Sequence, residues 1–233
     1  MVRARIATGD RRSQAACALL LFPALLTGCD VASGGGGSSA DDLGLNPITQ
    51  ATATALPGRL DEAALAGREA EGFTVTEAKA PAVRVSQNAC APAGYILSGM
   101  VIGKPASTVV RQASGEDTVV SVVLAEYEAE QAQPAMDALA TAVDECAGGF
   151  TATVDGEERG FGKVALELAP EGTDQAMGLR AVVERAGVKT PVKAVALRKG
   201  NTVAYVSAVP EGSVPKDFAV PAAVVDAQLA KLS

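Results

Sequence analysis

Val119-Val120-Ser121-Val122-Val123-Leu124-Ala125 is the most apolar β-rich run outside the N-terminal segment, and the fold is built around it. All of its residues except Ser121 are apolar, so a strand built from them has two sides that avoid water. Strands of this kind lie in the middle of a sheet, with a covering layer on each face. We therefore predict a central strand at 119–125.

An amphipathic helix is predicted beyond this strand. Pro134 suits its first turn, and Gly148-Gly149 suits its end. Four residues recur at i, i+3, i+7 and i+10 and therefore share one face of the helix: Met136, Leu139, Val143 and Cys146.

The remaining segments extend this pattern in both directions. A short helix is predicted at 60–68, and a final helix opens at Pro221. Gly200-Asn201 between two β-rich runs is a hairpin signal. Further strands are predicted at 73–79, 95–102, 161–168, 177–184, 192–198 and 202–209.

Strands that follow one another through tight turns form an antiparallel sheet, and the amphipathic helices must cover its faces. The sequence therefore predicts an α+β fold. It has an antiparallel sheet of about six to seven strands and two to three helices packed on it.

Residues 1–28 have the features of an export signal. Four arginines precede an apolar run at 15–26 that is too short to span a bilayer. The run ends in Leu26-Thr27-Gly28-Cys29, which resembles a bacterial lipobox, in which the cysteine receives a diacylglycerol thioether and becomes the new N-terminus. The alternative is an ordinary signal peptide with a chance cysteine. The lipobox predicts a lipoprotein held in the cell membrane by its acyl chains, on the extracytoplasmic face.

Residues 29–55 are predicted to form a tether between the lipidated Cys29 and the domain. The segment contains Gly34 to Gly37 and a Thr/Ala/Gln-rich stretch, a composition that buries too little apolar surface to fold. The folded domain is therefore predicted to span residues 56–233.

Composition and charge exclude several classes of function. The chain has no His, so it cannot carry a Ser-His-Asp triad, a Cys-His pair or imidazole ligands to a metal. Without residues 1–28, which hold four Arg and one Asp, 16 basic and 26 acidic residues remain, and the net charge is −10 rather than −7. An acidic chain with few aromatic residues does not suit nucleic-acid binding.

Two cysteines remain for the folded domain. Cys17 leaves with the signal and Cys29 carries the lipid, so Cys90 and Cys146 are predicted to pair in an exported protein. The alternative is two buried free thiols. The disulfide would fasten the end of the helix that contains Cys146 to the segment around Cys90.

The order of these elements resembles the extracellular sensor domain of PknH-type receptor serine/threonine kinases, which also occurs in free-standing actinobacterial lipoproteins. Three segments carry the resemblance: 119–127 with the helix that closes in Asp144-Glu145-Cys146, 193–206 with its Arg198-Lys199-Gly200-Asn201 turn, and 220–232. The resemblance implies a twisted antiparallel sheet and a cleft for an unidentified ligand. Family members often have two disulfides, whereas this chain can form one. The sequence contains no kinase motifs.

No catalytic constellation is found. Ser213-Val214-Pro215-Lys216 matches the SxxK pattern, but Pro215 fits poorly inside the helix that this motif requires, and no SDN or KTG motif accompanies it. Asp155, Glu157 and Glu158 lack the spacing of a calcium loop and suit a solvated hairpin tip better. We predict no enzyme activity, no metal and no cofactor.

Four residues combine reach with hydrogen bonding near predicted strand ends and are the candidates for ligand contacts: Tyr95, Arg111, Tyr127 and Tyr205. Their alternative roles are packing by the tyrosines and solvation of the arginine. Glu126, Glu128 and Glu130 suit the entry to a helix, although Glu126 follows the central strand directly and would reach a cleft there.

The function expected from the sequence is that of a membrane-anchored extracytoplasmic lipoprotein with a ligand-binding or sensor-type domain for a small molecule or envelope component. The alternative is a structural or assembly protein that docks onto another envelope protein. With seven aromatic residues left in the mature chain, a cleft lined by Val, Leu, Ala and Met favours an aliphatic or lipid-like ligand over a stacked sugar.

Overall fold

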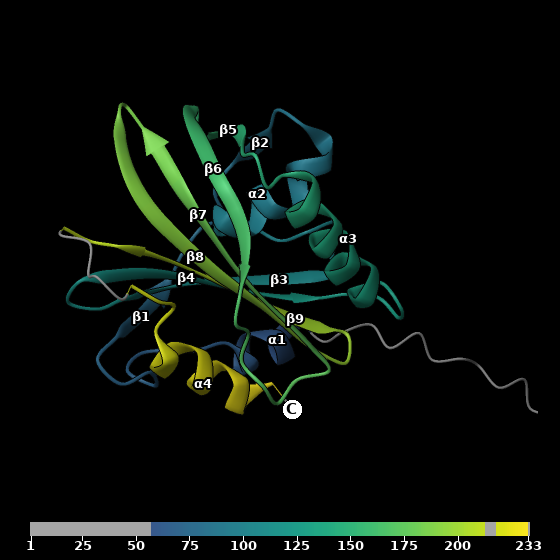
Figure 1. The fold of residues 1–233 in the computed structure, drawn as a ribbon. Coiled ribbons are helices and arrows are strands. Elements are labelled where there is room, and N and C mark those ends of the chain that lie inside the picture. Colours follow the sequence, from purple (N-terminus) through teal and green to yellow (C-terminus); the bar gives the residue numbers. More distant parts are fainter. Residues whose placement is uncertain (1–56, 213–217, 233) are drawn as a thin grey trace, which may run out of the picture. The chain divides into compact units, whose positions relative to one another are not determined.

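The computed structural model describes residues 57–212 and 218–232, which form nine strands and four α-helices in an α+β arrangement (Figure 1). The helices are α1 (Pro57–Ala63), α2 (Ala91–Leu97), α3 (Ala132–Glu145) and α4 (Ala222–Lys231), and a 3-10 turn at Asn88–Cys90 precedes α2. The strands are β1 (Thr74–Glu77), β2 (Val83–Val85), β3 (Ser107–Ser114), β4 (Thr118–Glu126), β5 (Phe150–Val154), β6 (Glu157–Glu167), β7 (Gln175–Arg185), β8 (Val188–Lys199) and β9 (Thr202–Pro210).

All nine strands belong to one antiparallel sheet, in the order β1-β3-β4-β9-β8-β7-β6-β5-β2. Hairpins join β3 to β4 and each neighbouring pair from β5 to β9. The two halves meet where β4 pairs with β9, with Val123 opposite Tyr205. The predicted fold class is confirmed, with more strands and helices than the sequence suggested.

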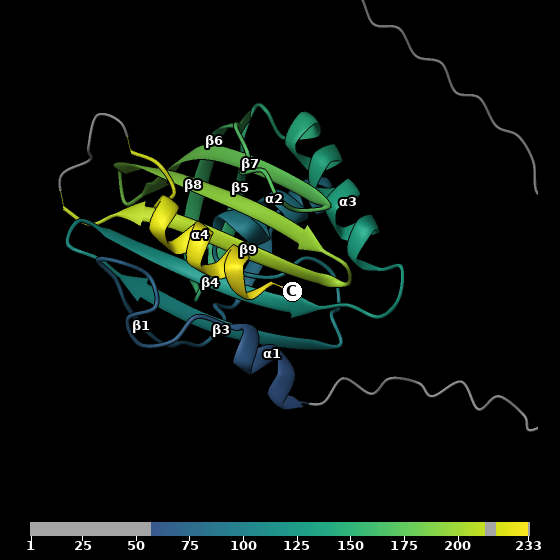
Figure 2. The ribbon, with the colours of Figure 1, turned by 90° about the horizontal axis from the view of Figure 1, so that it is seen from below.

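The sheet separates two apolar cores. Helices α2 and α3 cover one face, which we call the α2/α3 face, and helices α1 and α4 cover the other, which we call the α1/α4 face. Figure 2 shows α4 lying across the middle strands of its face. Consecutive residues of a strand point to opposite faces, so Val122 and Leu124 enter one core while Val123 and Ala125 enter the other. The prediction of a central strand covered on both sides is confirmed.

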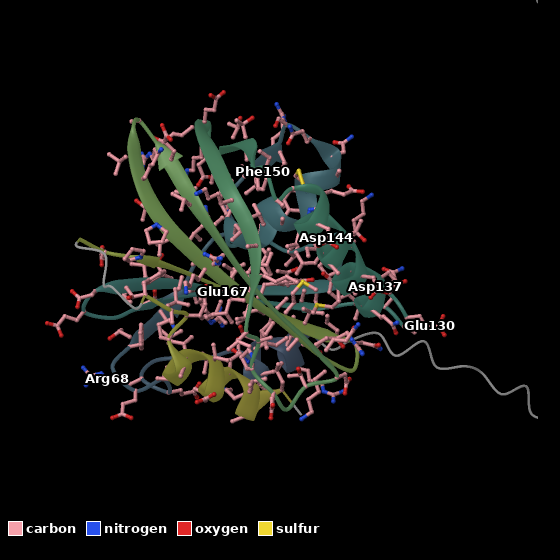
Figure 3. The ribbon with its side chains drawn as sticks, in the orientation of Figure 1. Arg68, Glu130, Asp137, Asp144, Phe150 and Glu167 are labelled. Atoms are coloured by element: carbon pink, nitrogen blue, oxygen red, sulfur yellow. A yellow bond between two sulfur atoms is a disulfide. The ribbon has the colours of Figure 1, made fainter. Side chains whose placement is uncertain are left out.

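Helix α3 and the disulfide follow the sequence prediction. Met136, Leu139, Val143 and Cys146 are all at most 3% exposed. Asp137 and Asp144 lie on the opposite face of the helix and point away from the sheet (Figure 3). Cys146 caps the C-terminal end and is bonded to Cys90.

The strand predicted at 95–102 is wrong, because residues 91–97 form helix α2. Pro92 lies in its first turn, and the buried residues Ala93, Ile96 and Leu97 follow helical spacing. A short apolar run cannot be assigned to a strand or a helix from periodicity alone. Gly94 decides how closely the helix packs, because a Cβ there would lie 2.5 Å from Val85 Cγ2.

Smaller differences concern boundaries and omitted strands. The first helix occupies Pro57–Ala63 rather than 60–68. Strands β2, β3 and β5 have no counterpart in the sequence prediction. The hairpin at Gly200-Asn201 is present, and Pro221 is the residue before α4. The predicted signal, the lipidated Cys29 and the tether lie outside the described residues.

Candidate functional site

Tyr127 and Tyr205 lie together in the core between the sheet and helices α2 and α3. Their hydroxyl oxygens are 2.6 Å apart, and the Tyr127 hydroxyl donates to the carbonyl of Ile102 over 2.6 Å. Since Tyr127 has one proton to donate, the Tyr205 hydroxyl donates to the Tyr127 oxygen. The tyrosines are 4% and 1% exposed, and burial is the main cause that raises the pKa of each.

Arg111 and Tyr95 lie elsewhere. Arg111 is on β3, opposite Val122, and therefore on the α1/α4 face, where it pairs with Asp61 of α1. Tyr95 is half-buried on α2, against the core of the other face. The sheet thus keeps Arg111 apart from the tyrosines, and none of the four lines any of the three cavities described below.

Two of the three acidic candidates at the β5–β6 turn, Asp155 and Glu157, bind other groups of the protein, and Glu158 is exposed. Asp155 accepts a hydrogen bond from the backbone N–H of Ala82 over 2.9 Å. Glu157 pairs with Arg185 over 2.6 Å and lies 3.8 Å from Arg159. Within the described part of the chain, no group of three or more His, Cys, Asp or Glu side chains is arranged to hold a metal ion. Ser213 and Lys216 of the SxxK string lie outside the described residues.

The largest of the three cavities is an open groove of about 780 Å³ at one end of the sheet, where β5, β6 and β7 meet. We call it the glycine groove, because five of its lining residues are glycines. It is lined by Gln87, Gly148, Gly149, Phe150, Thr151, Glu158, Gly160, Phe161, Gly162, Lys163, Val182, Glu184, Ala186, Gly187 and Lys189.

The floor of the groove includes bare backbone of β6. Phe161 is 3% exposed and enters the α2/α3 core, so Gly160 and Gly162 face the other way, toward the groove. A Cβ at Gly160 would meet only the Glu184 Cβ at 3.9 Å, and one at Gly162 only the Val182 carbonyl oxygen at 3.9 Å. Neither glycine has a φ in the left-handed region. Crowding of a side chain and a left-handed φ therefore do not explain these two glycines, and the register shift between β6 and β7 begins only after Gly162.

The disulfide fastens one wall of the groove. Gln87 precedes Cys90 by three residues, and its side-chain oxygen lies 3.5 Å from Cys90 Sγ. Gly148, Gly149, Phe150 and Thr151 come just after Cys146. Because Cys90 and Cys146 are bonded, the two segments that form this wall are linked covalently.

The groove offers both polar and apolar contacts. Lys163 and Lys189 supply positive charge, and Glu158 and Glu184 supply negative charge, with the Lys189 ammonium 3.6 Å from the Glu184 carboxylate. Phe150 and Phe161 stack with ring centroids 4.9 Å apart, but they are 5% and 3% exposed and their rings belong to the α2/α3 core. Val182, which is 37% exposed, is the apolar side chain that the groove offers. Charges of both signs around it suit an uncharged or zwitterionic molecule.

Two other cavities differ in character. A polar pocket of about 460 Å³ lies between α1, the end of α4 and the β8–β9 turn, and Glu126 is one of its lining residues, as the sequence suggested. An apolar slot of about 300 Å³ lies beside the start of α4. Its Val, Leu and Ala side chains match the lining expected for an aliphatic ligand, whereas the lining of the glycine groove does not.

The sequence analysis missed the groove, although one signal was present. Gly160-Phe161-Gly162 places two glycines on the same face of a strand, and glycine in a strand often marks a close approach by a ligand or another backbone. The predicted strand began at Phe161, so the pair was not recognised. The contribution of Gln87 has no local signal, because its position depends on the disulfide.

None of the helices at 57–212 and 218–232 is long and apolar enough to cross a bilayer. No family model matches the chain. No curated protein sequence matches it either.

Solved structures similar to this one include two mycobacterial proteins. The extracellular domain of PknH from Mycobacterium tuberculosis is 16% identical, with a TM-score of 0.49, and the match covers 76% of this chain and 94% of that one. An uncharacterised protein from Mycobacterium smegmatis, the ortholog of Rv0999, is 16% identical with a TM-score of 0.36, over 70% and 90% of the two chains. This degree of likeness does not establish family membership or function.

Proposed function

We propose that the chain is an extracytoplasmic lipoprotein, anchored through Cys29, whose domain binds a small molecule or an envelope component in the glycine groove. The sequence resemblance to PknH-type sensor domains is the reason for describing the domain as sensor-type. The chain has no kinase motifs, so a signal would pass to another protein.

The observation that carries the proposal is the pair Gly160 and Gly162 on the groove floor. Glycine inside a strand destabilises it by about 0.5–1 kcal/mol relative to alanine. This cost occurs twice at positions where an alanine side chain would fit, and it is explained if a ligand lies directly against the backbone. The volume of about 780 Å³ falls within the range of small-molecule sites.

The test uses substitutions that fill the groove. Wild-type protein isolated from its own host is expected to carry a small-molecule adduct in native mass spectrometry, and Gly160→Leu or Gly162→Leu is expected to abolish it. Thr153→Leu, which adds the same side chain to an exposed position on β5 outside the groove lining, is the matched control and should retain the adduct.

Folding of each variant is checked by thermal unfolding. Gly160→Ala and Gly162→Ala are expected to stabilise the domain by about 0.5–1 kcal/mol each, because the glycine cost disappears. The proposal is wrong if folded Gly162→Leu protein keeps the adduct, or if the wild type isolated from its host carries none.

A docking function is the second candidate. Leu168 is 99% exposed and Leu166 is 56% exposed, so two large apolar side chains close together in sequence are available to a partner. The open glycine groove favours ligand binding, and the two exposed leucines favour docking, at different places on the domain.

A further inference from the structure

The apolar slot is formed by two chain segments that approach each other on the α1/α4 face. One wall is the connection after β6, at 168–170, and the other is the start of α4 with the residues before it. Gly178 and Val195 lie beneath them. The full lining is Glu167, Leu168, Ala169, Pro170, Gly178, Ala194, Val195, Ala219, Val220, Ala222, Val225 and Asp226.

Leu168 stands at the lip of this slot and is 99% exposed. Its backbone passes close to β7, because a Cβ at Gly178 would lie 2.7 Å from the Leu168 carbonyl oxygen and 2.9 Å from that of Glu167. The chain therefore passes directly over the bare backbone of β7. The leucine is presented at a defined place beside a cavity of apolar character.

Charges of opposite sign flank the leucine and the slot. The Glu167 carboxylate, labelled in Figure 3, lies 2.8 Å from the Lys193 ammonium and 3.7 Å from the Arg180 guanidinium, so two cations share one anion. The Arg180 side chain is 59% exposed. On the opposite wall, Asp226 is exposed and forms no ion pair with a described residue.

We propose that this surface pairs with the same surface of a second copy of the chain. Leu168 of each copy occupies the apolar slot of the other, and the Arg180 and Lys193 cations of each face the Asp226 carboxylate of the other. The projecting leucine and the slot lie in one small patch. A two-fold axis through this patch therefore creates two equivalent contacts, with each leucine in the slot of the other copy. The cations lie beside the leucine and the carboxylate lies beside the slot, so this pairing brings opposite charges together.

The contact is expected to be weak in dilute solution. Stable interfaces bury about 1,200–2,000 Å² in total, which one leucine and one slot on each side do not supply. If the chain is anchored as proposed, two copies on one membrane have a raised effective concentration, and a weak contact suffices. The pairing itself does not depend on the glycine groove.

Analytical ultracentrifugation of the Cys29→Ser chain, which carries no lipid, tests the pairing. The sedimentation coefficient is measured from about 10 µM to about 1 mM protein, the range in which a weak interface forms. A concentration-dependent dimer is expected. Leu168→Ser should weaken it about ten- to a hundredfold, because a leucine is no longer buried. Ala222→Trp should weaken it similarly by filling the slot from an exposed position.

Val188→Ser is the matched control, since Val188 is 65% exposed at the tip of the β7–β8 hairpin, at the other end of β8. It should leave dimerisation unchanged. Asp226→Arg should weaken the dimer, and adding Arg180→Asp should restore part of it. A chain that stays monomeric at the highest concentration, or a dimer insensitive to Leu168→Ser, overturns the proposal whatever the outcome of the groove experiment.

Discussion

At the scale of single residues, Tyr127 and Tyr205 show how burial changes the role of a polar side chain. Each combines an aromatic ring with a hydroxyl, the features that suggest a ligand contact, yet their hydroxyls bind each other and the Ile102 carbonyl inside the core. Burial raises the pKa of both because the tyrosinate form loses its hydration. Their role in this structure is to satisfy buried polar groups.

This gives a prediction for alkaline pH. In the unfolded chain tyrosine ionises near pH 10, and in the fold the pKa of both is higher, so the neutral pair contributes stability below pH 10 that is lost as the pH rises further. The chain has three tyrosines, so Tyr95→Phe leaves only this pair. We expect its tyrosinate absorbance to appear together with the loss of circular dichroism. Ionisation near pH 10 in a protein that remains folded would contradict the burial argument.

At the scale of elements, the disulfide sets the position of α3 relative to α2. Cys146 caps α3, Cys90 ends the 3-10 turn before α2, and 56 positions separate them in sequence. Closing a loop of this length restricts the unfolded chain and stabilises the fold by on the order of 4 kcal/mol on the chain-entropy model. The same bond joins the two segments of the groove wall.

Replacing both cysteines by alanine is therefore expected to lower the free energy of unfolding by about 4 kcal/mol, measured with denaturant in a Cys29→Ser background. The groove adduct should weaken in parallel, because Gln87 and Gly149 are no longer held together. A free energy of unfolding equal to that of the parent would show that the linkage does not restrict the unfolded chain.

At the scale of the whole molecule, the sheet determines which residues can act together. Arg111 pairs with Val122 of β4, and Tyr205 pairs with the next residue, Val123. Because neighbouring residues of a strand point to opposite faces, Arg111 and Tyr205 lie in separate cores. Both the glycine groove and the apolar slot include residues on the face of β7 that points away from α2 and α3, such as Val182 and Gly178. The face that α2 and α3 cover is filled by core side chains.

The proposed anchor concerns the whole chain, because a lipid on Cys29 would decide where the domain works. Cys29→Ser is expected to abolish labelling by a radioactive or clickable fatty acid and to release the protein from membranes into the medium, since the acyl chains supply the attachment. Cys17→Ser, within the predicted signal, is the control and should leave labelling intact. Continued membrane attachment of Cys29→Ser would show that another part of the chain holds it.

Features that depend on local pattern could be predicted from the amino-acid sequence. Val119–Ala125 specified a buried central strand, the spacing from Met136 to Cys146 specified the inner face of α3, and Gly200-Asn201 specified a hairpin. The disulfide followed because two cysteines can pair in one way only. For the strand, the helix and the hairpin, residues close together in sequence carry the physical requirement, which is a hydrophobic period or a turn conformation.

Tertiary structure alone decided the rest. Residues 91–97 form a helix that packs closely on Val85 of β2 and Phe150 of β5 at Gly94, although the apolar pattern at 95–97 suits a strand equally well. The glycine groove brings together residues from 87 to 189, and the slot brings Leu168 to Asp226. Such sites depend on which strands become neighbours and on the face toward which each side chain points. Both are properties of the assembled sheet, so no single segment encodes them.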